Sequence, residues 1–138
     1  MATYNKFNQT VEDLAHGVYN LGTDQLVVAL TAAANAPVAT NSVLANLTEI
    51  SYTNCSSRNV TTTTSEGSDG SYELVLTDLT LTASGGTVGP LRYVILYSDT
   101  PTSPADPLLG WWDYGSDITL QDGETLLIDF AANTITLV

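Results

Sequence analysis

The apolar positions of the chain recur at every second residue over short stretches, which is the period of a β-strand. The strongest signal, Leu91–Tyr97, is apolar on both faces apart from Arg92, and it predicts a central strand covered on both sides. Other strands are predicted at Gln25–Leu30, Arg58–Thr64, Ser71–Ala83, Leu108–Trp112, Ile118–Leu120, 126–130 and 135–137. About seven or eight short strands at this spacing predict a mainly β fold, a single-domain β-sandwich or small barrel of jelly-roll type over residues 1–138.

The long segment Ser71–Ala83 changes its alternation partway along. Its apolar residues share one parity up to Leu76 and the other parity from Leu79 onward. A strand cannot move its apolar set to the other face without an extra residue. We therefore expect a bulge or bend near Thr77-Asp78.

Turns and loops are predicted where Gly, Pro, Asp and Asn gather between the strands. These segments are Thr31–Ser42, Ser65–Gly70, 85–90, Ser98–Pro107, Tyr114–Asp117 and 131–133. Gln121–Glu124 contains the Asp-Gly pair typical of tight hairpins, which predicts a hairpin over Ile118–Phe130. In that hairpin Leu126, Ile128 and Phe130 alternate inward.

One segment has helical spacing. Asn8–His16 begins with residues that cap a helix, carries acidic residues in its first turn and is followed by Gly17. We expect one short N-terminal helix there, docked on the sheet through an apolar face made of Val11, Leu14, Ala15 and Val18. The segment Val43–Ile50 fits irregular structure with room for a short helix.

Charge narrows the choice of partners. The net charge is −12, and Lys6, Arg58 and Arg92 are the three cations. A phosphate backbone or an anionic membrane surface is bound through clusters of Lys and Arg, so nucleic-acid binding and membrane docking are not expected. The acidity fits either solubility through mutual repulsion or a basic partner surface, and the sequence leaves both readings open.

The chain also lacks the sequence signals of export and membrane insertion. Met1–Lys6 has no apolar core of a secretory signal, and no apolar run approaches the length of a membrane span. The single cysteine, Cys55, cannot form a disulfide within the chain. We expect a soluble protein made in a cytoplasm.

Neither the sequence motifs nor the reactive residues predict an enzyme. His16 is the only histidine, and Cys55 has no cationic neighbour except Arg58, so no base is paired with a nucleophile. Phosphate-binding loops and zinc-type Cys/His spacings are also missing from the sequence. No catalytic, cofactor-binding or metal-binding residue is assigned, and no cofactor is expected.

A group of aspartates leaves two chemical alternatives open. Their loops follow one another along the second half of the chain: Asp99, Asp106, Asp113, Asp117 and Asp122. Several such oxygens could hold calcium, and two carboxylates could serve a glycosidase. Neither alternative has a motif, and in a chain of net charge −12 loop carboxylates are expected in any case.

Several residues are candidates for contacts with a partner. Trp111 and Trp112 are adjacent in a predicted strand, so one indole faces the core and the other faces outward, toward an interface or a sugar. Residues 1–7 form a possible N-terminal arm, in which Tyr4 and Phe7 have no core pattern. The Thr-rich segment containing Arg58 and Thr62 is predicted as an edge strand able to pair with another chain.

Three segments carry a resemblance over nearly the whole chain: NKFNQTVEDLAHGVYNLGTDQLVVALT, APVATNSVLANLTEI, and the block GPLRYVILYSDT followed by DPLLGWWDYGSDITLQDGETLLIDF. Together they resemble small virion structural proteins of tailed bacteriophages. The resemblance implies a capsid cement (decoration) protein that binds the major capsid protein of an assembled icosahedral head. The virion would be its location, after synthesis in the cytoplasm of the host bacterium.

The same resemblance leaves a second role open, that of a tail, baseplate or head-fibre component, in which a glycan-binding surface would be expected. It supplies no catalytic residues. By analogy with the three-fold positions of capsid lattices, we expect a symmetric homo-oligomer, with a trimer favoured.

Overall fold

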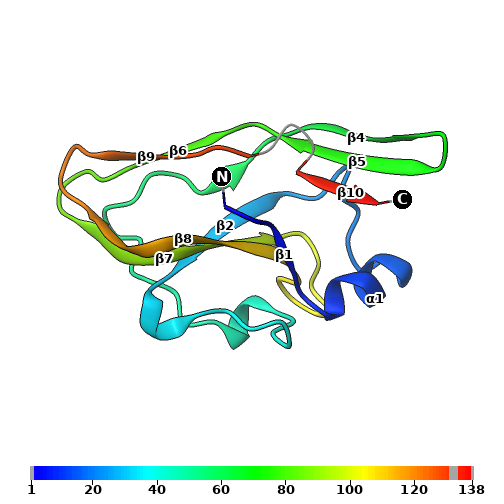
Figure 1. Cartoon of the computed structure of the whole chain (residues 1–138), viewed down its shortest axis with the longest axis horizontal. Helices are drawn as coiled ribbons and strands as arrows, with labels where there is room; N and C mark the ends of the chain where they lie inside the picture. Colours follow the sequence, from blue (N-terminus) through cyan, green and yellow to red (C-terminus); the bar gives the residue numbers. More distant parts are fainter. Residues whose placement is uncertain (1, 131–133, 138) are drawn as a thin grey trace.

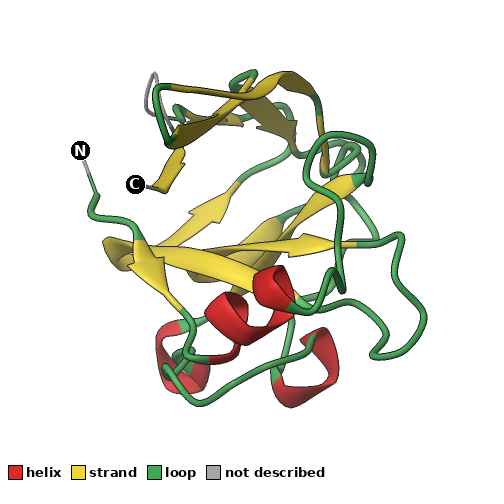
Figure 2. Ribbon diagram, turned by 90° about the vertical axis from the view of Figure 1, so that its right-hand side faces the viewer, coloured by secondary structure: helices red, strands yellow, loops and turns green. Residues whose placement is uncertain are grey.

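The computed structural model describes residues 2–130 and 134–137, and it is a mainly β, sandwich-like domain with one short α-helix (Figures 1 and 2). All strand pairs are antiparallel, as expected for a sandwich. The strands are β1 (Asn5–Lys6), β2 (Leu26–Thr31), β3 (Asn59–Val60), β4 (Thr62–Ser68), β5 (Ser71–Leu76), β6 (Leu79–Thr82), β7 (Val88–Ser98), β8 (Leu108–Leu120), β9 (Thr125–Ile128) and β10 (Ile135–Leu137). The helical segments are α1 (Gln9–Ala15) and two 3₁₀ turns, η1 (Ala33–Asn35) and η2 (Leu44–Asn46). The predicted turn at 131–133 lies outside the described residues.

The first layer is a five-stranded sheet in the order β1-β8-β7-β2-β3. β7 contains the predicted strand Leu91–Tyr97 and occupies the middle of this sheet, between β8 and β2. Every residue of β2 is buried. The predicted central strand is therefore confirmed.

The second layer consists of a three-stranded sheet, β10-β5-β4, and a two-stranded sheet, β6-β9. β5 and β6 are separated only by Thr77-Asp78, which confirms the predicted break in alternation. At this break the side chain of Asp78 accepts a hydrogen bond from the backbone N–H of Phe130 at 2.9 Å. The aspartate thus connects the break between β5 and β6 to the segment that follows β9.

The five-stranded sheet is buried on both faces, which explains the continuous apolar character of its central strands. The main core lies between the layers and includes Leu30, Leu74, Leu91 and Leu96. On the other face a smaller cluster contains Phe7, Val27, Ala29, Ile95, Tyr97 and Leu108, with Leu44 and Leu47 packed against it. Figure 2 places the helical segments on this outer side of the sheet.

The turn predicted at Tyr114–Asp117 is wrong, because β8 continues from Leu108 to Leu120. β8 pairs with β7 at Asp113↔Tyr93 and again at Ile118↔Leu91, so four residues of β8 lie opposite one residue of β7. Gly115 adopts φ +104°, a conformation that glycine accepts readily. The same residues that suit a turn here form a wide bulge, and the chain does not reverse.

The hairpin predicted over Ile118–Phe130 is also wrong. The Asp122-Gly123 turn forms, with Gly123 at φ +88°, but β9 pairs with β6 and makes no pair with β8. The turn therefore carries the chain from the first layer to the second. The inward positions of Leu126, Ile128 and Phe130 are confirmed by their burial.

The predicted helix forms as α1, and Leu14 and Val18 pack against the main core as predicted, but the rest of the predicted apolar face is wrong. Val11 is 53% exposed, whereas Thr10 and Asp13 are buried. The hydroxyl of Thr10 donates a hydrogen bond to the carbonyl of Leu109 at 2.9 Å, and Tyr19 donates to the carbonyl of Thr10 at 3.3 Å. Hydrogen bonds to β8, more than apolar burial, decide which side of this short helix faces inward.

The predicted N-terminal arm is not free. β1 pairs with β8 at Asn5↔Trp111 and Lys6↔Gly110, and Phe7 has no exposed surface. A strand of two residues is too short to show an alternating pattern of apolar and polar positions. The sequence therefore gives no sign that Phe7 is buried next to a strand.

The predicted edge strand Arg58–Thr64 is divided between the layers. β3 forms one edge of the five-stranded sheet, and β4 forms one edge of the three-stranded sheet. The turn predicted at Ser65–Gly70 is reduced to Asp69-Gly70, because β4 extends to Ser68. Both turn residues have positive φ, 51° and 83°, as a tight two-residue hairpin requires.

Candidate functional site

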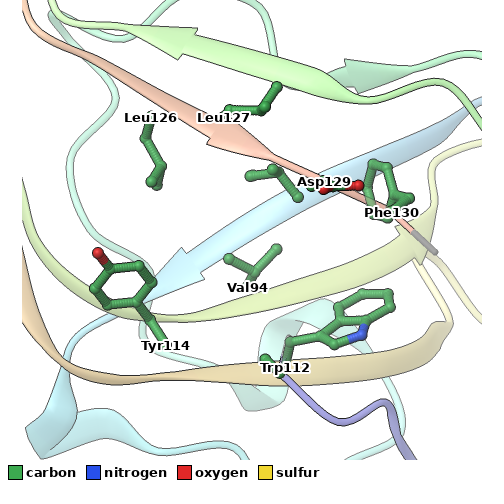
Figure 3. A pocket seen from close by; sticks show the side chains of 9 residues that line it. Val94, Trp112, Tyr114, Leu126, Leu127, Asp129 and Phe130 are labelled. Carbon is green, nitrogen blue, oxygen red and sulfur yellow. The ribbon is translucent and has the colours of Figure 1, made fainter.

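The candidate site is a pocket of about 160 Å³ between the two layers (Figure 3). We call it the Trp112 pocket. Val94, Trp112 and Tyr114 line it from β7 and β8, and residues 126–130 line it from β9 and the segment that follows. Among the residues that the structure describes, β1 pairs with β8 only at residues 110 and 111, and β9 pairs with β6 alone. The pocket therefore lies where both layers end in an uncovered strand.

Trp112 is fixed by aromatic neighbours. Its ring centroid lies 5.4 Å from that of Tyr4 and 5.7 Å from that of Phe130, the latter in an edge-on arrangement at 68°. Tyr4 donates its hydroxyl hydrogen to the carbonyl of Leu109 at 3.1 Å. Burial raises the pKa of Tyr4 to about 12, so this hydroxyl remains a neutral donor at neutral pH. The indole is thus held in place before any ligand arrives.

Gly110 makes the approach of Tyr4 to β8 possible. A Cβ atom at this position would lie 2.1 Å from the ring of Tyr4 and 2.7 Å from the carbonyl oxygen of Asn5. Any side chain here would push β1 and Tyr4 away from the sheet. The glycine before the two tryptophans therefore positions the aromatic stack around Trp112.

Tyr114 reaches the pocket because of the bulge in β8. The guanidinium of Arg92 binds the carboxylate of Asp113 through Nε at 2.8 Å and Nη2 at 3.0 Å, and Gly115 N–H donates to the same carboxylate at 2.7 Å. Arg92 is the main cause that lowers the pKa of Asp113, so the carboxylate is ionised near neutral pH. These bonds hold the first half of the bulge and leave the Tyr114 side chain 55% exposed.

The opposite wall comes from the second layer. Leu126 is partly buried, Leu127 is 57% exposed, and Asp129 is exposed at the end of the wall. Within the described part of the chain, Asp129 takes part in no ion pair. The pocket thus offers three aromatic rings, aliphatic side chains and one carboxylate, which is a set suited to binding.

The two tryptophans point to opposite faces, as predicted, but neither is deeply buried or fully exposed. Trp111 packs on Phe7 with ring centroids 4.5 Å apart and belongs to the outer cluster. Trp112 packs against the main core. The prediction that one indole faces the core is confirmed by Trp112, whereas the prediction of an outward-facing indole is wrong, because the segment that contains Phe7 covers Trp111.

The other contact candidates are distributed over the molecule. Arg58 stacks on Tyr52 with its guanidinium carbon 3.6 Å from the ring centroid, lies 3.8 Å from Glu49 and donates to the carbonyl of Val28. It therefore bonds within its own chain. Thr62 is half-buried at the start of β4, opposite Leu76. Of the six candidates, the structure brings Tyr4 together with Trp112, and it brings the buried Phe7 together with Trp111.

Sequence reasoning missed Tyr114, Leu127 and Asp129. Tyr114 was assigned to a turn, and Asp129 follows the last residue of β9 without any motif. The available signal was Leu127, a large apolar residue between two inward positions of an alternating strand. Such a residue must face outward, and an exposed leucine beside a tryptophan strand indicates a contact surface.

The loop aspartates have structural roles. Asp117 accepts from the backbone N–H of Ala33 at 2.9 Å, and Asp122 accepts from that of Gly85 at 3.0 Å. Burial, followed by the nearby charge of Asp99, raises the pKa of Asp106. Among the described residues, no three His, Cys, Asp or Glu side chains are placed to hold a metal ion.

The two remaining reactive residues also have ordinary surroundings. Burial raises the pKa of the Cys55 thiol, with Arg58 acting in the opposite direction. A raised pKa disfavours the reactive thiolate. His16 is exposed at the end of α1, where its Nδ1 lies 3.7 Å from Glu12. Neither residue lines the Trp112 pocket.

A second hollow, of about 370 Å³, lies between α1, β1 and β10. Val11 and Leu137, two of the exposed large apolar residues, are in its lining, together with Lys6. β10 is an edge strand, so its outer side has no partner in the sheet. This α1–β10 hollow is a second candidate contact surface.

The chain matches no family model, no curated protein and no solved structure. Over the residues that the structure describes, no helix is long and apolar enough to cross a membrane. A function therefore has to be argued from the sequence resemblance, the charge and the geometry of the surface.

Proposed function

We propose that this protein is a capsid cement protein of a tailed bacteriophage, which acts without catalysis and binds the major capsid protein on the assembled head. Three segments that resemble virion structural proteins support the proposal, as does a two-layered β domain buried on both faces of its main sheet. Its place would be the capsid surface.

The observation that carries the proposal is the distribution of charge. Arg58 lies beside Glu49, and Arg92 is bound by Asp113, so two of the three cations are neutralised within the chain. The net charge is −12, and exposed carboxylates such as Glu66, Asp69 and Asp129 present part of it to the solvent. A surface of this kind attracts a basic lattice and speeds its encounter with it.

The mechanism is thermodynamic. A protein that binds only the mature lattice stabilises that lattice by mass action. Copies that each bridge neighbouring capsid subunits add avidity, since the second contact of a bound copy is intramolecular. A rigid sandwich loses little conformational freedom on binding, so more of its contact energy remains to hold subunits together.

Self-association as a trimer is part of the proposal. The α1–β10 hollow supports it, because Val11 on α1 is 53% exposed and Leu137 on β10 is 39% exposed, and β10 pairs only with β5 among the described strands. An unpaired edge beside apolar residues favours pairing with another copy of the chain. The trimer, rather than another number, follows from the analogy with three-fold lattice positions.

A tail, baseplate or head-fibre component that binds a glycan is the second candidate function. The observation that favours it is the Trp112 pocket, since Trp112 and Tyr114 offer aromatic surfaces on which a sugar could stack.

Copy number and head binding separate these functions. For a cement protein, mass spectrometry of purified virions should find on the order of hundreds of copies per particle, as avidity over a lattice requires. The purified protein should co-sediment with empty heads and release as the ionic strength rises. A handful of copies per virion, or the absence of co-sedimentation at low salt, would overturn the proposal.

A further inference from the structure

The Trp112 pocket has an unusual combination of apolar walls and a negative end. Val94, Leu126 and Ile128 are aliphatic, Trp112 and Tyr114 are aromatic, and among the described residues Asp129 is the only charged one in the lining. We infer that this pocket receives a single cationic side chain, an arginine or lysine, from the surface of the partner protein. The identity of that partner as a capsid protein rests on the proposed function.

The shape of the pocket fits such a side chain. Arginine and lysine carry long aliphatic stems that pack on apolar surface while the charged group stays near water. Leu126 and Leu127 are part of the lining, and the volume of about 160 Å³ admits one side chain. In Figure 3 the walls from β8 and β9 face each other across this space.

The electrostatics fit a cation. A positive group is attracted to the face of Trp or Tyr, with Trp the stronger of the two. Asp129 is exposed and without an ion pair in the described part of the chain, so its charge is available to a partner. The net charge of −12 adds a long-range attraction for basic groups.

A sugar fits less well. A glycan site needs several placed hydrogen-bonding groups to recognise the hydroxyls. The polar side-chain groups that line this pocket are the carboxylate of Asp129, the hydroxyl of Tyr114 and the indole N–H of Trp112. Tyr114 is 55% exposed, and Trp112 is packed between Tyr4 and Phe130. The pocket therefore has few hydrogen-bonding groups held in fixed orientations.

The pocket is also ordered before binding. Trp112 is held between two rings, and the Arg92–Asp113 pair holds the start of the bulge that presents Tyr114. A preformed site loses less side-chain entropy when a flexible stem enters it. The inference is therefore testable with a small probe and without the partner protein.

The test is an NMR titration of the full chain with Nα-acetyl-arginine methylamide, observing the Trp112 indole N–H. The neutral isostere Nα-acetyl-citrulline methylamide and methyl glucoside are the comparison probes. The arginine probe should shift the Trp112 signal with a dissociation constant on the order of millimolar, and citrulline should bind roughly threefold to tenfold more weakly. Asp129→Asn should weaken the arginine probe by a similar factor.

Glu66→Gln is the matched control, because Glu66 is an exposed carboxylate on β4, outside the pocket lining. It removes the same charge and should leave the titration unchanged. Equal binding of citrulline and arginine, a response to methyl glucoside alone, or an equal loss in Glu66→Gln would each overturn the inference.

The two proposals fail separately. If the wild-type protein co-sediments with heads but the arginine probe produces no shift, the pocket inference is wrong and the cement function stands. If the probe binds as described but the protein does not sediment with heads, the cement function is wrong and the pocket chemistry stands.

Discussion

Trp111 and Trp112 are neighbours in β8, yet the two faces of the strand on which they lie are covered differently. On the Trp111 face, Phe7 lies 4.5 Å away between ring centroids, and Leu44 and Leu47 close the outer cluster. On the Trp112 face, two short sheets form the opposite layer, and their edge strand β9 leaves a pocket beside the indole.

The comparison shows that the burial of an aromatic residue in a strand depends on whether the segment packed over it continues past the residue or ends beside it. An irregular segment such as residues 32–50 can follow the contour of a sheet, so it closes the Trp111 face. Paired strands are stiffer and end at an edge, so they leave surface uncovered at that edge. The Trp111 face is closed by the smaller outer cluster, whereas the Trp112 face carries the main core and, at its uncovered edge, the pocket that could bind a partner.

The largest effect is expected from Phe7→Ala, which opens the closed face. Phe7 has no exposed surface, and truncating such a ring costs about 3–5 kcal/mol. Urea denaturation of the purified variant measures this loss. Leu127→Ala, at a residue that is 57% exposed, is the control and should remain near the wild type. If the two variants unfold alike, Phe7 does not close the Trp111 face as described.

Gly110→Ala should come next, because it acts on the Trp112 face through Tyr4. The added methyl group would lie 2.1 Å from the Tyr4 ring, and overpacking of this kind costs about 1–3 kcal/mol. In a double-mutant cycle with Tyr4→Ala, the two losses should not add, since removing the ring also removes one of the clashes. Simple additivity in urea denaturation would contradict the packing described for Tyr4.

A smaller, pH-dependent effect is expected from Asp113→Asn at the start of the bulge. Arg92 holds the pKa of Asp113 below its value in the unfolded chain. The ionised carboxylate therefore contributes stability above the unfolded pKa of about 4, and this contribution is lost as the pH falls through the lower folded pKa. Denaturation curves should separate the variant from the wild type at pH 6 but bring them together in acid. A difference that grows on acidification would contradict this sign.

The smallest effect on stability is expected from Tyr114→Ala, which sharpens the distinction between folding and binding. The side chain is 55% exposed, and changes at such positions usually lie within about ±0.5 kcal/mol. The arginine probe should nevertheless bind more weakly, because one aromatic wall is gone. If the variant binds the arginine probe as tightly as the wild type does, Tyr114 takes no part in binding, and the contribution of the Trp112 pocket is limited to Trp112 and Asp129.

The pattern of apolar and polar residues predicted the central strand and the break in the second layer, because both depend only on neighbouring residues. The two-sided apolar run of Leu91–Tyr97 marked the central strand, and the change of parity located the break at Thr77-Asp78. Both follow from the fixed period of a strand, which any correct pairing must respect.

Features that depend on distant pairing could not be predicted in the same way. Glycine with positive φ suits a turn and a bulge equally, so Gly115 did not reveal that β8 continues. The Asp-Gly pair at 122–123 predicts that the chain reverses, but it does not predict which strand β9 pairs with after the reversal. The pocket combines both of these features, and Tyr114 and Asp129 therefore escaped the sequence reasoning.

The antiparallel pair β1–β8 has a consequence for synthesis on the ribosome. Asn5 pairs with Trp111, and Tyr4 bonds to Leu109 across 105 positions of sequence. β2 is buried along its whole length, and its main partner, β7, is synthesised only later. At roughly 5–20 residues per second, β1 and the apolar strand β2 emerge several seconds before their partners. We therefore expect the domain to fold after synthesis rather than during it, with its acidic residues keeping the waiting chain dispersed.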